Sequence, residues 1–126
     1  MSQSTEVGPD AFINAAIEAG VRNGVESLDA NERLIFLISE AEVRCDKDGI
    51  DSFLDRYRPN WIQETARAFA AVGAVEISAA LGAITLDTLP DDPLLDRANK
   101  LITSRSGYDY DAIRKVVEQR IAMRRP

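Results

Sequence analysis

Apolar residues recur along most of the chain at spacings of three and four, which is the period of an amphipathic helix. No segment shows the sustained alternation of apolar and polar residues that is typical of strands. The pattern therefore predicts an all-α protein with six or seven helices. No repeat or linker divides the sequence, so we expect one compact domain over residues 1–126, with residues 1–8 as a disordered tail and residues 122–126 frayed.

Local signals mark where the helices begin and end. Pro9 suits the first position of a helix, and Asp29 with Glu32 has the spacing of a capping box. Asn60 is expected to cap a helix that begins at Trp61, and Asp92 precedes a proline in the same way. The expected helices span about residues 9–22, 30–45, 50–56, 61–72, 74–86, 93–105 and 110–121.

The segment 74–86 differs from the others because it is apolar on nearly all faces. A helix of this kind is normally central in a bundle. The alternative is a helix that lies partly under the second subunit of a dimer, and the sequence does not separate the two.

Charge is distributed unevenly along the chain. Residues 1–111 hold 20 acidic and 10 basic side chains, whereas residues 112–126 hold one acid and five bases. The body is therefore acidic and only the final helix is basic. An acidic body repels the phosphate backbone, so we expect no direct binding of nucleic acid.

The residue types that are missing exclude several kinds of chemistry. The sequence contains no histidine, which removes Ser-His-Asp and Cys-His catalysis and the histidine-containing metal sites. The single cysteine, Cys45, lies on an apolar stripe and is expected to be a buried, inert thiol. We therefore expect a non-enzymatic protein without cofactor or metal.

The same features bear on location. One cysteine allows no disulfide within the chain, which fits a reducing compartment. The first ten residues lack the features of a signal peptide, and charged residues interrupt the longest apolar stretch, so we expect a cytoplasmic protein that does not enter a membrane.

The run Asp46-Lys47-Asp48-Gly49 has some likeness to a calcium-binding loop. With Gly49 at the sixth position of such a loop, Asp55 stands at the twelfth, but Arg44 stands where the first oxygen ligand is needed. The sequence therefore favours an acidic turn between two helices, in which Gly49 adopts a positive φ.

Acidic residues in loops and at helix ends, with two loop tyrosines, are the candidate partner-binding residues. Carboxylates attract Arg and Lys side chains, and tyrosines are frequent anchors in interfaces, whereas Trp61 is expected in the core because it heads an apolar face. The candidates are Asp46, Asp48, Asp51, Asp55, Asp87, Asp91, Asp92, Tyr108 and Tyr110.

Between Leu34 and about Leu89 the order of features resembles a family of small bacterial helical DNA-mimic proteins. The matching residues are Glu42-Val43, Gly49, Phe53, Asn60 and Ala71-Val72-Gly73-Ala74. Between Val43 and Ile50 the chain departs from the family pattern, because one glycine, two asparagines and a glutamine of that pattern are absent. The resemblance implies a non-catalytic helical domain, often dimeric, whose carboxylates take the place of DNA phosphates on a transcription factor.

Two hypotheses follow from the sequence. The first is a protein-binding module whose acidic surface engages a basic partner, such as a transcription regulator. The alternative is a structural or assembly protein that forms a homodimer through the apolar segment 74–86.

Overall fold

The computed structural model describes residues 8–57 and 60–124, which fold into seven α-helices and one short 3-10 helix. No strand occurs within these two ranges, so the predicted all-α class is confirmed. The helices are α1 (Pro9–Asn23), the 3-10 helix η2 (Val25–Ser27), α2 (Ala30–Lys47), α3 (Ile50–Tyr57), α4 (Ile62–Ala71), α5 (Val75–Gly82), α6 (Pro93–Thr103) and α7 (Tyr110–Arg124).

The two chain ends were expected to be disordered or frayed. The tail prediction lies outside the described residues except for Gly8, which is the N-cap of α1. At the other end, α7 continues to Arg124, and the last two residues lie outside the described part of the chain.

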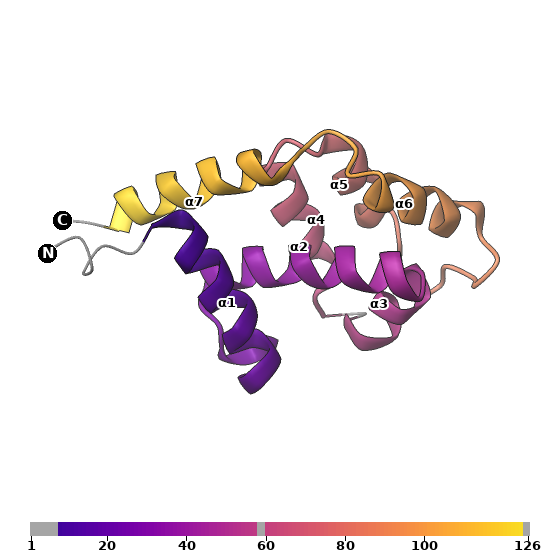
Figure 1. The fold of residues 1–126 in the computed structure, drawn as a ribbon. Helices are drawn as coiled ribbons and strands as arrows, with labels where there is room; N and C mark the ends of the chain where they lie inside the picture. The colour runs from indigo at the N-terminus through magenta and orange to yellow at the C-terminus, as the bar shows by residue number, and fades with distance from the viewer. Residues whose placement is uncertain (1–7, 58–59, 125–126) are drawn as a thin grey trace, which may run out of the picture.

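Helix α2 is the centre of the molecule. It packs against α1, α3, α4, α6 and α7, and Figure 1 shows it running through the middle of the fold with α1 crossing near its start. Five consecutive residues, 34–38, are buried, which a helix achieves only when neighbours cover it on more than one side. α1 begins and α7 ends at the same end of the molecule (Figure 1).

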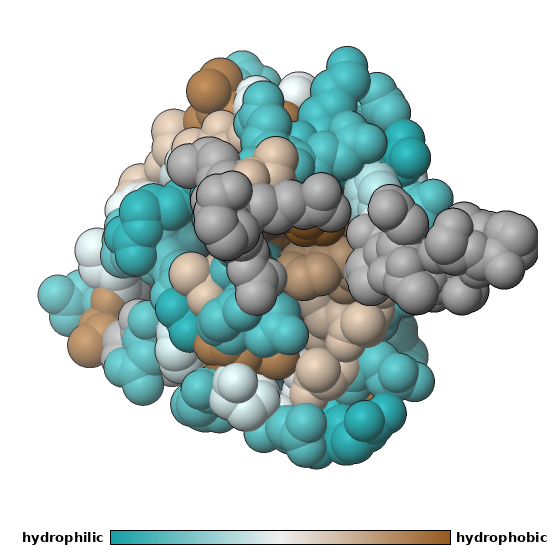
Figure 2. Space-filling view, turned by 90° about the vertical axis from the view of Figure 1, so that its left-hand side faces the viewer, coloured by the Kyte–Doolittle hydropathy of each residue, from teal (hydrophilic) through white to brown (hydrophobic). Residues whose placement is uncertain are grey.

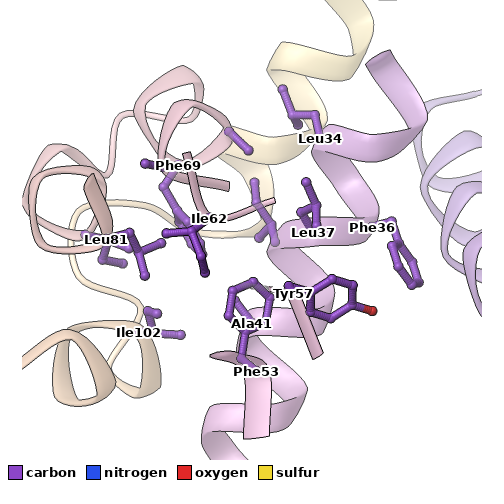
Figure 3. Packing of buried hydrophobic residues seen from close by; sticks show 14 of the residues in the cluster. Leu34, Phe36, Leu37, Ala41, Phe53, Tyr57, Ile62, Phe69, Leu81 and Ile102 are labelled. Carbon is purple, nitrogen blue, oxygen red and sulfur yellow. The ribbon is translucent and has the colours of Figure 1, made fainter. Parts of the chain in front are cut away.

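The hydrophobic core forms where α3, α4 and α6 pack against α2 and α5 packs against α4 and α6 (Figure 3). Phe53 and Phe69 have no exposed surface, and Leu37 and Ile102 are buried as completely. The Tyr57 ring packs between Phe53 and Phe36, with ring centroids 5.0 and 6.4 Å away. This core fixes the helix ends and turns that carry the polar residues discussed below.

Most of the predicted helix ends agree with the structure. Asp29 and Glu32 form both hydrogen bonds of a capping box, and the Asp92 side chain accepts a hydrogen bond from the backbone of Leu94. One prediction is wrong: Asn60 does not cap α4. Trp61 occupies the N-cap position, because its carbonyl accepts the first hydrogen bond of the helix, from the backbone N–H of Thr65, and Ile62 is the first helical residue.

The segment 74–86, expected either to be central in the bundle or to lie partly under a second subunit, is only partly buried within the chain. α5 ends at Gly82, and only Ile77, Ala80 and Leu81 are buried within it. Val75 and Leu86 are 68% and 69% exposed. The outward positions between them include Glu76 beside the small residues Ala79, Gly82 and Ala83, so the segment is not enclosed by the rest of the chain.

No helix in the described part of the chain is long and apolar enough to span a bilayer.

Gly20 is needed where α1 crosses α2, since a Cβ at this position would overlap the ring of Phe36. We expect Gly20→Ala to lower the free energy of unfolding by about 1–3 kcal/mol, the usual cost of overpacking a core. Gly82→Ala is the matched control, because its Cβ would meet only a side-chain oxygen 4.0 Å away and would gain up to about 1 kcal/mol of helix propensity. Urea denaturation measures both; equal midpoints for the two variants would contradict the proposed overlap.

Candidate functional site

The side chain of Asp46, at the end of α2, is paired with another residue of the same chain. Its carboxylate forms a two-pronged ion pair with Arg105, whose Nη1 and Nη2 lie 3.2 and 2.7 Å from the two oxygens. These hydrogen bonds lower the pKa of Asp46 below its ordinary value, with a further contribution from the charge of Arg105. Asp46 is therefore neutralised by a residue 59 positions away and contributes little to attracting a cationic partner.

Arg105 adopts a left-handed backbone conformation, with φ of 55°, directly after α6. The backbone there forms a Schellman motif, in which Ser106 N–H bonds to Leu101 and Arg105 N–H to Ile102. Glycine is the usual residue at this position. Arginine is tolerated because its side chain binds Asp46 and approaches Glu42 to 3.4 Å.

Tyr108 is part of the same network and is not free for a partner. Its hydroxyl donates a short hydrogen bond to Glu42, and its ring packs edge-on against Phe69 at 5.5 Å. Burial and the hydrogen bond to Glu42 raise the pKa of Tyr108. The tyrosine therefore attaches the turn between α6 and α7 to α2 and α4, which explains its partial burial.

Tyr110 remains 51% exposed, although its hydroxyl donates a hydrogen bond of 2.8 Å to Asp10. Arg114 approaches the same carboxylate oxygen to 3.0 Å. Of the two candidate tyrosines, Tyr110 alone is largely exposed, and it lies between the start of α7 and the start of α1.

Asp48 and Asp55 lie on either side of the turn between α2 and α3. Both are exposed and line a shallow hollow that Arg44 and Arg56 also line. Gly49 has a positive φ of 94°, as predicted for the turn. Because α2 ends at Lys47 and α3 begins at Ile50, residues 44–55 are mostly helical and cannot form a twelve-residue calcium loop.

Asp51, Asp91 and Asp92 come together, although 40 residues separate the first two. They line a groove of about 300 Å³ between the start of α3 and the start of α6, and Asp96 lines it too. We call this the acidic groove. Its other lining residues are Gly49, Ile50, Pro90, Pro93, Leu95 and Asn99, so no lysine or arginine of the described chain lines it.

The partners of these carboxylates leave most of the negative charge uncompensated. Asp92 accepts the capping hydrogen bond of α6, and Asp96 pairs with Lys100 at 3.0 Å. Asp51 and Asp91 have no basic partner in residues 8–57 and 60–124. Asn99 contributes a buried amide oxygen that lacks a hydrogen-bond donor among the described residues.

The loop that leads into the groove is ordered by its own hydrogen bonds. The Thr88 hydroxyl accepts from the Thr85 backbone N–H at 2.9 Å, and Asp87 N–H bonds to the Thr85 hydroxyl at 3.1 Å. The turn exposes Asp87, and Leu86 and Leu89 are 69% and 65% exposed beside it. An apolar and acidic surface therefore precedes the groove along the chain.

A cavity of about 470 Å³ lies between the end of α1, the middle of α2 and the start of α4. On its wall, Glu40 accepts hydrogen bonds from Tyr57 at 2.7 Å and from Arg44 at 2.9 Å. Burial, with the bond to Glu40, raises the pKa of Tyr57 to about 12, so this phenol stays protonated at neutral pH. Glu26 and Arg56 also line the cavity, which gives equal numbers of opposite charges and selects no ligand charge.

Cys45 is buried, as predicted, with 4% of its surface exposed. Burial raises the pKa of its thiol to about 12, which keeps the sulfur protonated at neutral pH and unreactive. No group of three metal-ligating side chains occurs in the described part of the chain.

No family model, no curated protein and no solved structure matches the chain.

We expect Tyr108→Phe to lower the free energy of unfolding by about 1–2 kcal/mol, because it removes a hydrogen bond to a part-buried carboxylate. Tyr110→Phe deletes the same hydroxyl at an exposed site and should change stability by less than about 0.5 kcal/mol. Urea denaturation of the two variants checks this. A Tyr108 variant as stable as the parent would show that the hydroxyl does not secure the α6–α7 turn.

Proposed function

We propose that this protein is a non-enzymatic protein-binding module that captures a cationic segment of a partner protein in the acidic groove. The observation that carries the proposal is the meeting of Asp51, Asp91, Asp92 and Asp96 around one groove without a basic lining residue. A lysine or arginine side chain would be attracted by these carboxylates and could donate hydrogen bonds to them.

The surface around the groove supports a protein partner over a free cation. Leu86 and Leu89 offer apolar contact beside Asp87, and large exposed apolar side chains next to polar ones are typical of protein interfaces. A partner segment that carries both basic and apolar residues matches this surface. Basic segments of this kind occur in transcription regulators, which is the partner class that the resemblance to DNA-mimic proteins implies.

The proposal covers fewer residues than the sequence indicated. Asp46 and Tyr108 hold the fold together, and Asp48 and Asp55 lie beside arginines. The acidic groove with the loop 85–92 is therefore the proposed binding surface, and mimicry of DNA would involve this end of the molecule alone.

We expect a lysine- and arginine-rich peptide to bind at low salt and to weaken as salt is added, since exposed charges are screened. Asp91→Lys places a cation in the groove and should lower the affinity for the peptide by roughly tenfold in isothermal titration calorimetry. Glu18→Lys makes the same charge change on the exposed face of α1, outside the groove, and is the matched control. Equal losses in the two variants would mean that net charge, not the groove, attracts the peptide.

The partner class has its own test. Proteins captured from a lysate on the parent chain and on the Asp91→Lys variant are compared, and duplex DNA is then added. Release of the captured protein by DNA supports a DNA-binding partner. A partner that remains bound in excess DNA and in high salt contradicts both the mimicry and the electrostatic attraction.

The exposed face of α5 favours a second candidate, a homodimer that serves assembly. Val75 and Ala79 are four residues apart and exposed on α5, and Ala83 and Leu86 are exposed in the segment that follows the helix. Ala79 and Ala83 are small enough to let another helix approach closely, and Val75 and Leu86 offer exposed apolar side chains for contact. We expect a dimer in light scattering that Val75→Glu converts to a monomer; a monomeric parent chain at high concentration would reject this candidate.

A further inference from the structure

A second charged hollow lies at the end of the molecule where α2 begins and α7 ends. It has a volume of about 340 Å³ and lies between the first turns of α2, the middle of α4 and the last turns of α7. Ala30, Leu34 and Ala68 supply its apolar lining. Figure 2 shows this end of the molecule, where hydrophobic atoms lie in the middle of a mostly hydrophilic surface. We call it the basic hollow.

Its charge is opposite to that of the chain as a whole. Three guanidinium groups line the basic hollow, from Arg33, Arg67 and Arg120, against one carboxylate, from Glu64. The whole chain holds 21 acidic and 15 basic residues, so three arginines around one carboxylate are a local reversal. Such a reversal is the kind of charge arrangement that selects an anion.

The three arginines are not equally free to bind a ligand. Arg33 is committed to the fold: its Nε lies 2.6 Å from Glu64, its Nη1 donates to the Leu28 carbonyl, and its guanidinium stacks over Trp61. Arg120 uses Nη1 for the side chain of Asn31.

Arg67 is exposed and has no carboxylate partner in the described part of the chain. The positive charge of Arg33 is thus compensated by the negative charge of Glu64. Arg67 from α4 and Arg120 from α7 remain as lining residues without a carboxylate partner among the described residues, and guanidinium groups suit the planar or tetrahedral oxygens of carboxylate and phosphate.

We propose that the basic hollow binds a small amphiphilic oxyanion. Its phosphate or carboxylate group lies between Arg67 and Arg120, and its apolar body lies over Ala30, Leu34 and Ala68. The hollow has the volume of a small-molecule site. Neither half of the ligand suffices alone, because the apolar lining gives an inorganic ion no contact and a neutral molecule gains nothing from the arginines.

The test uses amide chemical shifts in ¹H–¹⁵N spectra of the full chain. Octyl phosphate is titrated below its micelle concentration, beside inorganic phosphate and neutral octyl glucoside. We expect saturable shifts at the residues of the basic hollow with octyl phosphate, and binding at least tenfold tighter than that of inorganic phosphate, because each buried methylene contributes about fourfold. Octanoate binding tighter than octyl phosphate supports a carboxylate as the natural head group, and the reverse order supports a phosphate.

Two variants locate the site. Arg67→Gln should lower the affinity for octyl phosphate about tenfold, which is the usual contribution of a hydrogen bond to a charged group. Ala30→Glu should abolish binding, since it places a carboxylate in the hollow at the first position of α2, where an acid is compatible with the helix. Arg97→Gln, an exposed arginine of α6 that does not line the hollow, is the matched control.

Three results would overturn the proposal. The first is shifts that are absent or spread over the whole surface. The second is equal affinity in the Arg67 and Arg97 variants. The third is binding of octyl glucoside as tight as that of octyl phosphate, which would leave an apolar hollow without anion selectivity.

Discussion

The structure depends on the burial of α2 by helices on several sides. A central helix that carried only apolar residues would meet no electrostatic constraint, but α2 also carries arginines and carboxylates among its buried residues. A charge that loses contact with water must be paired, because the unpaired state costs several kcal/mol. Later parts of the chain supply the partners: Glu64 of α4 for Arg33, Tyr57 of α3 for Glu40, and Tyr108 of the α6–α7 turn for Glu42. The same turn supplies Arg105 for Asp46, which is exposed.

This pairing decides which acids remain available to other molecules. Carboxylates along α2 are satisfied within the chain, so their number in the sequence overstates the negative surface. Asp51 at the start of α3 and Asp91 just before α6 are different, because both are exposed to water and form no ion pair within the described residues. Asp51 and Asp91 therefore contribute unpaired negative charge to the groove.

The sequence predicts the helices well because their ends depend on neighbours within a few residues. The capping box of Asp29 and Glu32, the Asp92 cap and the Gly49 turn are all local, and all three are found. The roles of Asp46 and Tyr108 were not predictable in this way, since their partners are 59 and 66 residues away. No sequence pattern indicated the role of Arg105. Its left-handed backbone conformation is explained only by the ion pair with Asp46, which the structure shows. The meeting of Asp51 with Asp91 likewise depends on how α3 and α6 pack, which the spacing of apolar residues does not specify.

The two charged hollows are far enough apart to act independently. The basic hollow borders the first turn of α2, and the acidic groove begins at Gly49, just beyond its last turn. From Leu34, which lines the basic hollow, to Lys47 at the end of α2 the helix rises by about 20 Å, at 1.5 Å per residue. Exposed charges are screened over about 8 Å at physiological salt, so each hollow presents its own sign of charge to a ligand and is little affected by the other. Net charge is for this reason a poor guide to what the protein binds: an acidic chain can attract a cation at one end of its central helix and an anion at the other.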